Sequence, residues 1–223
     1  MTPPARSRRP IGRPRGDGRP HLTRHEALLA AARLISAEGY TGASIRMIAQ
    51  ELGVATASLF NLFPSKDALL NELVVYLAQP SLDFYRRLGG FSLAPDVALY
   101  KSLYEEAFVV ASVDPALPAI FYLPELRKPQ FGPAQKARAA LVGHYRALIG
   151  AGCADGAFVC DLPDLAAEQM LQLTETSVLA ALPESPADRA HASARLALRG
   201  LLARPERLDA VKAQAQRIKL TIL

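Results

Sequence analysis

Arginine side chains are concentrated at the N-terminus of this 223-residue chain, where several could bind an anionic surface together. Residues 1–25 hold seven arginines and one acidic residue, Asp17, so this segment has a charge of +6 (seven minus one). Because the whole chain has a net charge of +5, the rest carries −1. A basic arm on a nearly neutral body is typical of proteins that bind a polyanion, and nucleic acid and an anionic membrane both fit. The many Pro and Gly residues among the arginines predict a disordered arm over residues 1–22.

A second set of polar side chains lies between residues 44 and 66, on segments with helical patterning. A first helix is predicted to follow the N-cap Thr23, with Glu26 three residues later, and to stop at Gly39. A second helix follows the N-cap Ser44 and ends at Gly53, because its apolar residues recur at i, i+3, i+4 and i+7. In this arrangement the polar side chains between residues 44 and 66 would lie on one side of the helices.

A third short helix is predicted over Thr56–Leu62, with Leu59 and Phe63 facing inward. Pro64 ends it, and Ser65 caps a fourth helix. Two short helices joined by a tight glycine turn, with a third packed across them, form a helix-turn-helix whose second member enters the major groove of DNA. The arginine arm directly upstream favours this interpretation over a small helical bundle that does not bind DNA.

The same region carries motifs of a known family. The run from Thr23 to Leu73 contains A-x-x-L-I-x-x-x-G-Y, S-I-R-x-I-A-x-x-L-G-V, S-L-F-x-x-F and S-K-D-A-L-L, and it resembles the TetR family of transcriptional regulators. The match covers about fifty residues. The C-terminal region resembles the family only in its helical pattern and in the stretch A-D-G-A-F-V-C-D-L-P-D-L-A-A, so the resemblance implies no particular ligand.

The resemblance implies roles that agree with the chemistry of the side chains. Ser44 would bind a phosphate, and Arg46 would read a guanine edge with two hydrogen bonds. Thr56, Ala57 and Asn61 would face base edges, while Ser58 and Lys66 would bind phosphates. The expected DNA contacts are Arg13, Arg15, Arg24, Ser44, Arg46, Thr56, Ala57, Ser58, Phe60, Asn61 and Lys66. Solvated surface is the alternative for each of them.

The chain departs from the family pattern at three positions of the predicted DNA-binding domain (residues 23–70), which is called the head below. Phe60 stands where the family usually has tyrosine, and Leu62 stands where histidine or tyrosine is common, so two phosphate contacts are missing. Met47 replaces a common acidic or polar residue. Affinity for DNA is therefore expected to depend more on the arm. Its segment Gly12–Gly16 (G-R-P-R-G) resembles an AT-hook, whose arginines fit a narrow minor groove, and a general phosphate-binding tail is the alternative.

The rest of the chain is predicted to be helical, so the fold class is all-α. Apolar periodicity predicts helices near 94–113, 134–151, 163–182 and 186–203, with short helical pieces between Pro115 and Pro133. The predicted organisation is a disordered basic arm (1–22), a DNA-binding domain (23–70), a ligand-binding and dimerisation domain (71–205) and a C-terminal tail or loosely packed helix (206–223).

About 150 residues beyond the head exceed what dimerisation alone requires, and a small-molecule pocket would explain them. Aromatic and polar-tipped side chains on the central helices are candidates for its lining, although each could equally be ordinary core. The candidates for ligand binding are Tyr104, Phe108, Phe121, Tyr122, His144 and Thr174. By resemblance, helices 163–182 and 186–203 would pair with their symmetry mates in a homodimer. The expected apolar residues of that interface are Leu171, Val178, Leu179, Leu198, Leu201 and Leu202.

Other function classes lack support in the sequence. No nucleotide-binding, P-loop, serine-hydrolase or zinc-protease motif is found, so the chain is not expected to be an enzyme or to need a cofactor. His21 and His25 lack a partner carboxylate at ligand spacing, and Cys153 and Cys160 are expected to be reduced, so no metal is predicted. The expected partners are double-stranded operator DNA, a small apolar ligand and a second copy, in the cytoplasm and without a membrane. The predicted function is a repressor that its ligand releases; an activator, or a peripheral membrane protein bound through the arm, are the alternatives.

Overall fold

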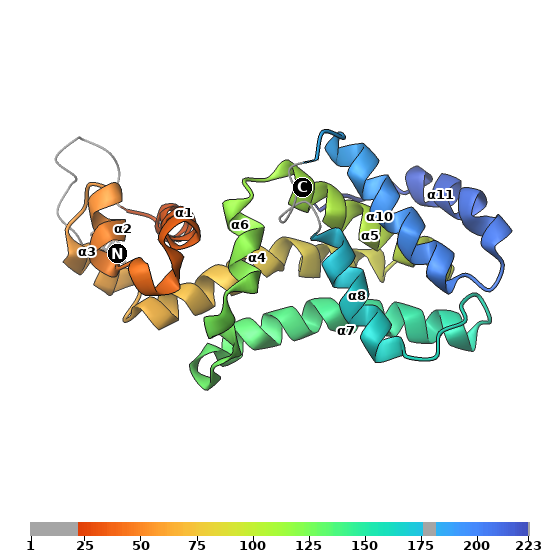
Figure 1. Ribbon diagram of the computed structural model, residues 1–223, viewed down its shortest axis with the longest axis horizontal. Coiled ribbons are helices and arrows are strands. Elements are labelled where there is room, and N and C mark those ends of the chain that lie inside the picture. Colours follow the sequence, from red (N-terminus) through yellow and green to blue (C-terminus); the bar gives the residue numbers. More distant parts are fainter. Residues whose placement is uncertain (1–21, 176–181, 223) are drawn as a thin grey trace, which may run out of the picture. The chain divides into compact units, whose positions relative to one another are not determined.

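The computed structural model describes residues 22–175 and 182–222, and the chain divides into two compact units, residues 1–69 and 70–223. The sequence analysis places the domain boundary at residue 70. In the described residues all regular elements are helices (Figure 1), which confirms the all-α prediction. None of the described helices is long and apolar enough to cross a bilayer.

The first unit begins with α1 (Arg24–Gly42), whose N-terminus has the predicted capping box. The Thr23 hydroxyl accepts a hydrogen bond from the Glu26 amide at 3.2 Å, while the Glu26 carboxylate accepts one from the Thr23 amide at 2.9 Å. These bonds satisfy two donors that a helix start leaves free. Gly39 has φ +71°, a conformation that favours glycine, and it interrupts the helical backbone before the last turn.

Helices α2 (Ile45–Glu51) and α3 (Thr56–Leu62) follow within the first unit. Ser44 caps α2 by accepting from the Met47 amide at 3.2 Å, and Gly53 makes the turn with φ +64°. The side chains that hold the three helices together are fully buried: Ile35, Ile48, Leu59 and Phe63. The helix-turn-helix thus has the bounds that its caps and glycines predict.

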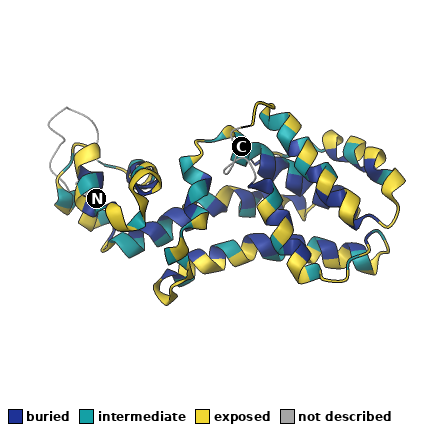
Figure 2. Ribbon diagram, in the orientation of Figure 1, coloured by how far each residue is buried: buried dark blue, intermediate teal, exposed yellow. Residues whose placement is uncertain are grey.

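The second unit surrounds α5 (Pro95–Ser112), which is buried along most of its length from Asp96 to Ala107 (Figure 2). The helices α7 (Gly132–Ala154), α8 (Pro163–Thr174), α10 (Pro186–Leu201) and α11 (Leu208–Arg217) all contact it. The long helix α4 (Lys66–Leu88) begins in the first unit and ends in the second. Short helices occupy the proline-rich stretch, as predicted: α6 (Ala116–Ala119), η1 (Ile120–Tyr122), η2 (Pro124–Arg127) and η3 (Pro129–Phe131).

The loop between α7 and α8 is fixed by one close contact and one backbone bridge. A Cβ atom at Gly152 would lie 2.0 Å from the ring of the buried Phe158, so only glycine leaves room for this ring. Phe158 forms an isolated antiparallel bridge with Leu202, and the Val159 amide donates to the Leu201 carbonyl at 2.8 Å. The loop that precedes α8 is thereby tied to the end of α10.

Two parts of the second unit differ from the sequence predictions. The segment after residue 205 was expected to be a tail or a loosely packed helix, but α11 buries Leu208, Val211 and Ala215 in the core, after the short η4 (Pro205–Arg207). The prediction was wrong because only one narrow stripe of α11 is apolar, and this stripe suffices to cover α5. The helix predicted over 163–182 corresponds to α8, which ends at Thr174. Residues 176–181 of the predicted range lie outside the described residues.

The predicted apolar dimer residues are also placed differently. Leu171, Leu198, Leu201 and Leu202 are at most 6% exposed within a single chain, so they belong to its own core. Val178 and Leu179 lie outside the described residues. The exposed apolar side chains of α8 and α10 are instead Leu165 and Leu196, at 52% and 63%. Periodicity identified the apolar stripes correctly but could not tell which neighbour each stripe covers.

Candidate DNA interface and ligand cavity

Helix α3 presents one face to the core of the first unit and the other to solvent. Leu59 is fully buried, whereas Ala57, Phe60 and Asn61 are exposed. The fourth exposed candidate, Arg46, projects from α2. Side chains with hydrogen-bonding and apolar tips on one exposed helix face match the requirements for reading base edges in the major groove. Thr56 and Ser58 are partly exposed on α3.

Lys66 has a structural contact that the sequence did not reveal. Its ammonium group donates to the backbone carbonyls of Tyr40 at 2.7 Å and Ala43 at 2.9 Å, and lies 4.2 Å from the centroid of the Tyr40 ring. The Tyr40 hydroxyl also bonds to Asp67. A cation at the free carbonyls of a helix end is favourable, so Lys66 joins α4 to the end of α1. Its role as a phosphate contact stays a prediction.

Replacement of Lys66 by methionine is expected to lower the free energy of unfolding by about 1–2 kcal/mol, because two charge-assisted hydrogen bonds are lost while the apolar stem remains. Urea unfolding monitored by circular dichroism measures this change. Arg46→Met is the matched control: it removes one positive charge from the same unit at an exposed position and should change stability by less than about 0.5 kcal/mol. Equal effects of the two substitutions would show that the carbonyl contacts contribute nothing to folding.

The remaining predicted DNA contacts lie in the first turn of α1, at the cap of α2, or before the described residues. Arg24 is exposed on the first turn of α1, with its guanidinium 5.2 Å from the centroid of the Phe63 ring. Ser44 is partly exposed, and its hydroxyl oxygen is already an acceptor in the cap of α2. Arg13 and Arg15 lie outside the described residues.

The second unit contains a cavity of about 590 Å³, a size typical of small-molecule sites. It is lined by α4, η1, η2, α7 and α8. Its apolar lining includes Val74, Phe121, Leu123, Leu126 and Val142. Its polar lining includes Tyr122, Arg127, Arg138, Arg146, Glu168 and Glu175.

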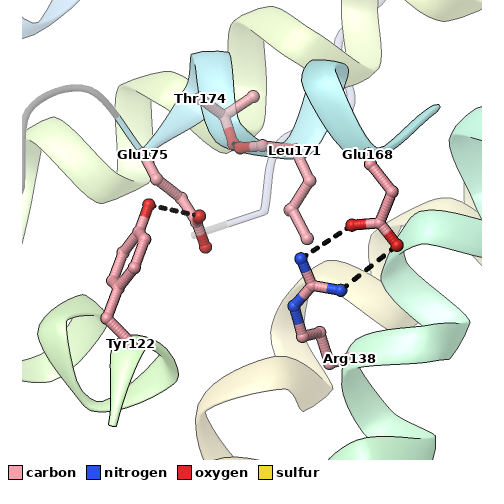
Figure 3. A network of polar contacts seen from close by, with 6 residues as sticks. All are labelled: Tyr122, Arg138, Glu168, Leu171, Thr174 and Glu175. Carbon is pink, nitrogen blue, oxygen red and sulfur yellow. Dashed lines mark hydrogen bonds and ion pairs between the residues drawn. The ribbon is translucent and has the colours of Figure 1, made fainter. Parts of the chain in front are cut away.

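Ion pairs and hydrogen bonds connect several of these polar lining residues, which together are called the polar wall of the cavity (Figure 3). The guanidinium of Arg138 donates to both carboxylate oxygens of Glu168, at 3.3 and 2.8 Å, and the Tyr122 hydroxyl donates to Glu175 at 2.6 Å. Burial raises the pKa of Glu175, while the Tyr122 hydroxyl and Arg138 lower it. Hydrogen bonding to Glu168 raises the pKa of Arg138. This wall therefore holds both signs of charge, which the aromatic and polar-tipped lining expected from the sequence did not include.

Of the six predicted ligand-binding residues, only Phe121 and Tyr122 line this cavity. Tyr104 and Phe108 stack on each other with centroids 6.0 Å apart, and Tyr104 also contacts the ring of His191 from α10. Thr174 is buried and donates to the Leu171 carbonyl at 2.7 Å. Roles for these residues in binding stay predictions.

His144, the sixth candidate, belongs to a buried polar cluster between α4, α5 and α7. Its ring stacks on Tyr85 at 3.7 Å, and its Nε2 lies 2.8 Å from the Ser102 hydroxyl. Burial lowers the pKa of His144 to about 4. Because the Ser102 hydroxyl donates to the Ala98 carbonyl at 2.9 Å, its oxygen is left to accept the hydrogen on Nε2 of the neutral ring.

Glu106 is the acid of this polar cluster. Its carboxylate accepts from the Tyr85 hydroxyl at 2.9 Å, and the Tyr85 hydroxyl lies 3.2 Å from that of Tyr145. Burial raises the pKa of Glu106 to about 7, while hydrogen bonds from Ser81 and Tyr85 lower it. The cluster was missed in the sequence because its members come from three separate helices.

Sequence reasoning also missed Arg138, Glu168 and Glu175. A signal for the first existed: Ala134, Arg138, Val142 and Arg146 recur every four residues, so they share one face of α7. That face lies along the cavity. The acids of α8 gave no such signal because the charged face of an amphipathic helix usually meets solvent.

Known proteins match this chain in sequence mainly over its head. Residues 27–73 match the model of the family described as bacterial regulatory proteins, tetR family. The HTH-type transcriptional repressor DrrR1 of Streptomyces coeruleorubidus is 38% identical over 69 residues, which cover 31% of this chain and 26% of that protein. The chain thus matches about a quarter of the length of this relative.

Solved structures extend the likeness to the whole fold. AmtR of Mycobacterium smegmatis has a TM-score of 0.70 and 29% identity, covering 93% of this chain and 100% of that chain. The ketosteroid transcriptional regulator KstR2 of Mycobacterium tuberculosis has a TM-score of 0.69 and 21% identity, covering 84% and 98%. FadR of Bacillus subtilis, solved in complex with stearoyl-CoA, has a TM-score of 0.62 and 17% identity, covering 80% and 99%.

The matched family model describes regulatory proteins and DrrR1 is a transcriptional repressor, which agrees with the prediction that the chain is not an enzyme. The family model covers the helix-turn-helix and the start of α4, the segment from which the resemblance was recognised. The likeness to AmtR covers both units. The helix-turn-helix of this chain, within residues 27–73, is that of the TetR family of bacterial transcriptional regulators.

Proposed function

We propose that the protein is a homodimeric repressor that occupies a palindromic operator in the cytoplasm and leaves it when a small molecule binds in the second unit. The single observation that carries the proposal is a helix-turn-helix with an exposed polar face in a chain whose second unit contains a cavity of about 590 Å³. DrrR1, which matches the head, is named as a repressor, and FadR was solved with a small molecule bound.

A second copy of the chain is the partner that a palindromic operator requires. A two-fold dimer would place two recognition helices about one DNA turn apart, roughly 34 Å. An open groove between α8 and α10 supports this arrangement: the exposed Leu196 and the partly exposed Leu173 line it above the buried Met170 and Leu201, and Gly200 leaves space for close approach. Apolar side chains that one chain leaves exposed are stabilised when a partner covers them.

Helix α4 connects the ligand with the DNA in this proposal. It begins in the first unit with Lys66, and its Val74 lines the cavity of the second. A ligand lowers DNA affinity only to the extent that it prefers the chain in its DNA-incompetent arrangement. Thermodynamic reciprocity then requires operator DNA to weaken ligand binding by the same factor, about 5- to 150-fold.

The test of the DNA-binding proposal is a footprint on the DNA that flanks the protein's own gene, followed by binding to an operator library. Two protected half-sites about one turn apart are expected. Asn61→Ala and Arg46→Ala should each cost about 1–3 kcal/mol at particular base pairs and relax the preference there. Ser58→Ala is the control and should weaken all sequences alike, because phosphate contacts carry no base information. Loss without position dependence in all three variants would contradict the assignment of the reading residues.

A further inference from the structure

The carboxyl group of Glu175 is the most deeply buried charge in the polar wall of the cavity. Glu175 is 9% exposed, and one of its oxygens accepts the hydrogen bond from Tyr122 (Figure 3). Burial raises its pKa, which means that its charge is poorly compensated in the free protein. A second oxygen of the same carboxyl group is available to a further donor.

The nearest cation does not neutralise Glu175. Arg138 lowers its pKa through space, yet both terminal nitrogens of this guanidinium are bonded to Glu168. Within residues 22–175 and 182–222, Glu175 has no ion pair within 4 Å. The opposite charges of Arg138 and Glu168 neutralise each other, so Arg138 does not neutralise the charge of Glu175.

The other charged side chains of the cavity are more exposed than Glu175. Arg127 is exposed, and Arg146 is 54% exposed and paired with Asp164. Solvent and salt screen exposed charges far more than buried ones, so the charge of Glu175 is felt most strongly inside the cavity. The buried Glu106 is within electrostatic range of Glu175, but it adds negative charge only as it loses its proton, because burial raises its pKa to about 7.

The apolar part of the cavity complements an organic cation. Phe121 and Tyr122 line the same cavity as Glu175, the Tyr122 hydroxyl is bonded to that carboxylate, and aromatic faces attract cations. Val74 and Val142 provide aliphatic surface in the same cavity. We propose that this cavity binds an amphipathic organic cation whose protonated amine pairs with Glu175 and whose apolar body lies against Phe121, Tyr122 and Val142.

This inference rests on the proposed function, since it names the chemical class of the releasing ligand. It also differs from the small apolar ligand expected from the sequence by adding a positive charge to the ligand. An amine at Glu175 would supply the charge that the protein itself does not provide, and a buried ion pair with its hydrogen bonds made is far more favourable than an unpaired buried charge.

Three probes with the same body and different heads test the proposal: 4-phenylbutylamine, 4-phenylbutanol and 4-phenylbutyrate. Their binding to the full chain is measured by isothermal titration calorimetry without DNA. The amine is expected to bind at least tenfold more tightly than the alcohol, and the carboxylate more weakly than either. In Glu175→Gln, which keeps the acceptor for Tyr122, the amine should lose at least tenfold in affinity while the alcohol changes less than twofold.

Asp161→Asn is the control, because it removes an exposed carboxylate shortly before the same helix and outside the cavity lining. It should change amine binding less than twofold. Tighter binding of 4-phenylbutyrate than of the amine, equal effects of the two substitutions, or no binding of any probe would overturn the proposal. Since DNA is absent, a chain that binds the amine but no operator would contradict only the proposed function, and the reverse result would contradict only this inference.

Discussion

Removal of residues 1–19 is expected to weaken binding to DNA of every sequence and to flatten its dependence on salt. Six arginines lie in this segment, and each phosphate contact that is lost removes about 0.9 from the slope of log affinity against log salt concentration. If all six bind phosphates, the slope changes by about 5, and the ratio of the two affinities changes by about a thousandfold between 50 and 200 mM salt. Fluorescence anisotropy over a salt series measures both quantities.

Replacement of the same six arginines by lysine separates the two functions considered for the arm. Lysine keeps the phosphate contacts but does not fit the narrow minor groove as arginine does. A general phosphate-binding tail therefore predicts an unchanged salt slope and unchanged sequence preference, whereas an AT-hook predicts loss of preference for flanking A·T pairs. An unaltered slope after complete removal of the segment would show that the arm does not contact phosphate.

Glu106→Gln is expected to stabilise the protein above pH 7 by up to about 3 kcal/mol. The pKa of Glu106 is raised by burial from its usual 4.5 to about 7, so the folded chain holds a proton between these values that the unfolded chain has lost. Stability conferred by this group is therefore full below pH 4.5 and is lost as the pH rises to 7. The difference of 2.5 (7 minus 4.5) corresponds to about 3 kcal/mol at 1.36 kcal/mol per pH unit.

The titration of His144 changes the stability of the protein with pH in the opposite direction, over nearly the same pH range. Burial lowers its pKa from 6.5 to about 4, so here the unfolded chain binds the extra proton and stability rises with pH. In the wild-type protein the two slopes oppose each other between pH 4.5 and 6.5. In Glu106→Gln the rising slope of His144 is no longer opposed by Glu106, and chemical denaturation at pH 5, 6, 7 and 8 should show the difference between the variant and the wild type. Parallel pH profiles of the variant and the wild type would contradict the buried, raised pKa of Glu106.

The head of the chain was predictable because its structure is determined locally. The cap at Ser44, the positive-φ glycine at Gly53 and the proline after Phe63 set the bounds of α2 and α3 from a few neighbouring residues. Exposure of Arg46 and Asn61 follows from the same periodicity. Lys66 was different, because its carbonyl partners Tyr40 and Ala43 lie more than twenty residues away in the sequence.

The cavity was only partly predictable because it depends on distant pairs. Tyr122 meets Glu175 across 53 positions, and Arg138 meets Glu168 across 30, and no local pattern indicates either contact. Polar-tipped aromatic residues were the expected ligand contacts. His144, however, satisfies its polar atom within the core, where an unpaired group would be costly.

The backbone bridge between Phe158 and Leu202 holds the loop before α8 to the end of α10. The opposite end of this twelve-residue helix is followed by Glu175 at the cavity, about 18 Å away at 1.5 Å per residue. A ligand that displaces Glu175 is therefore expected to shift Leu173, at the same end of α8, more than Leu165, which lies nearer to the held loop. The proposed dimer groove would consequently be altered most at its Leu173 side.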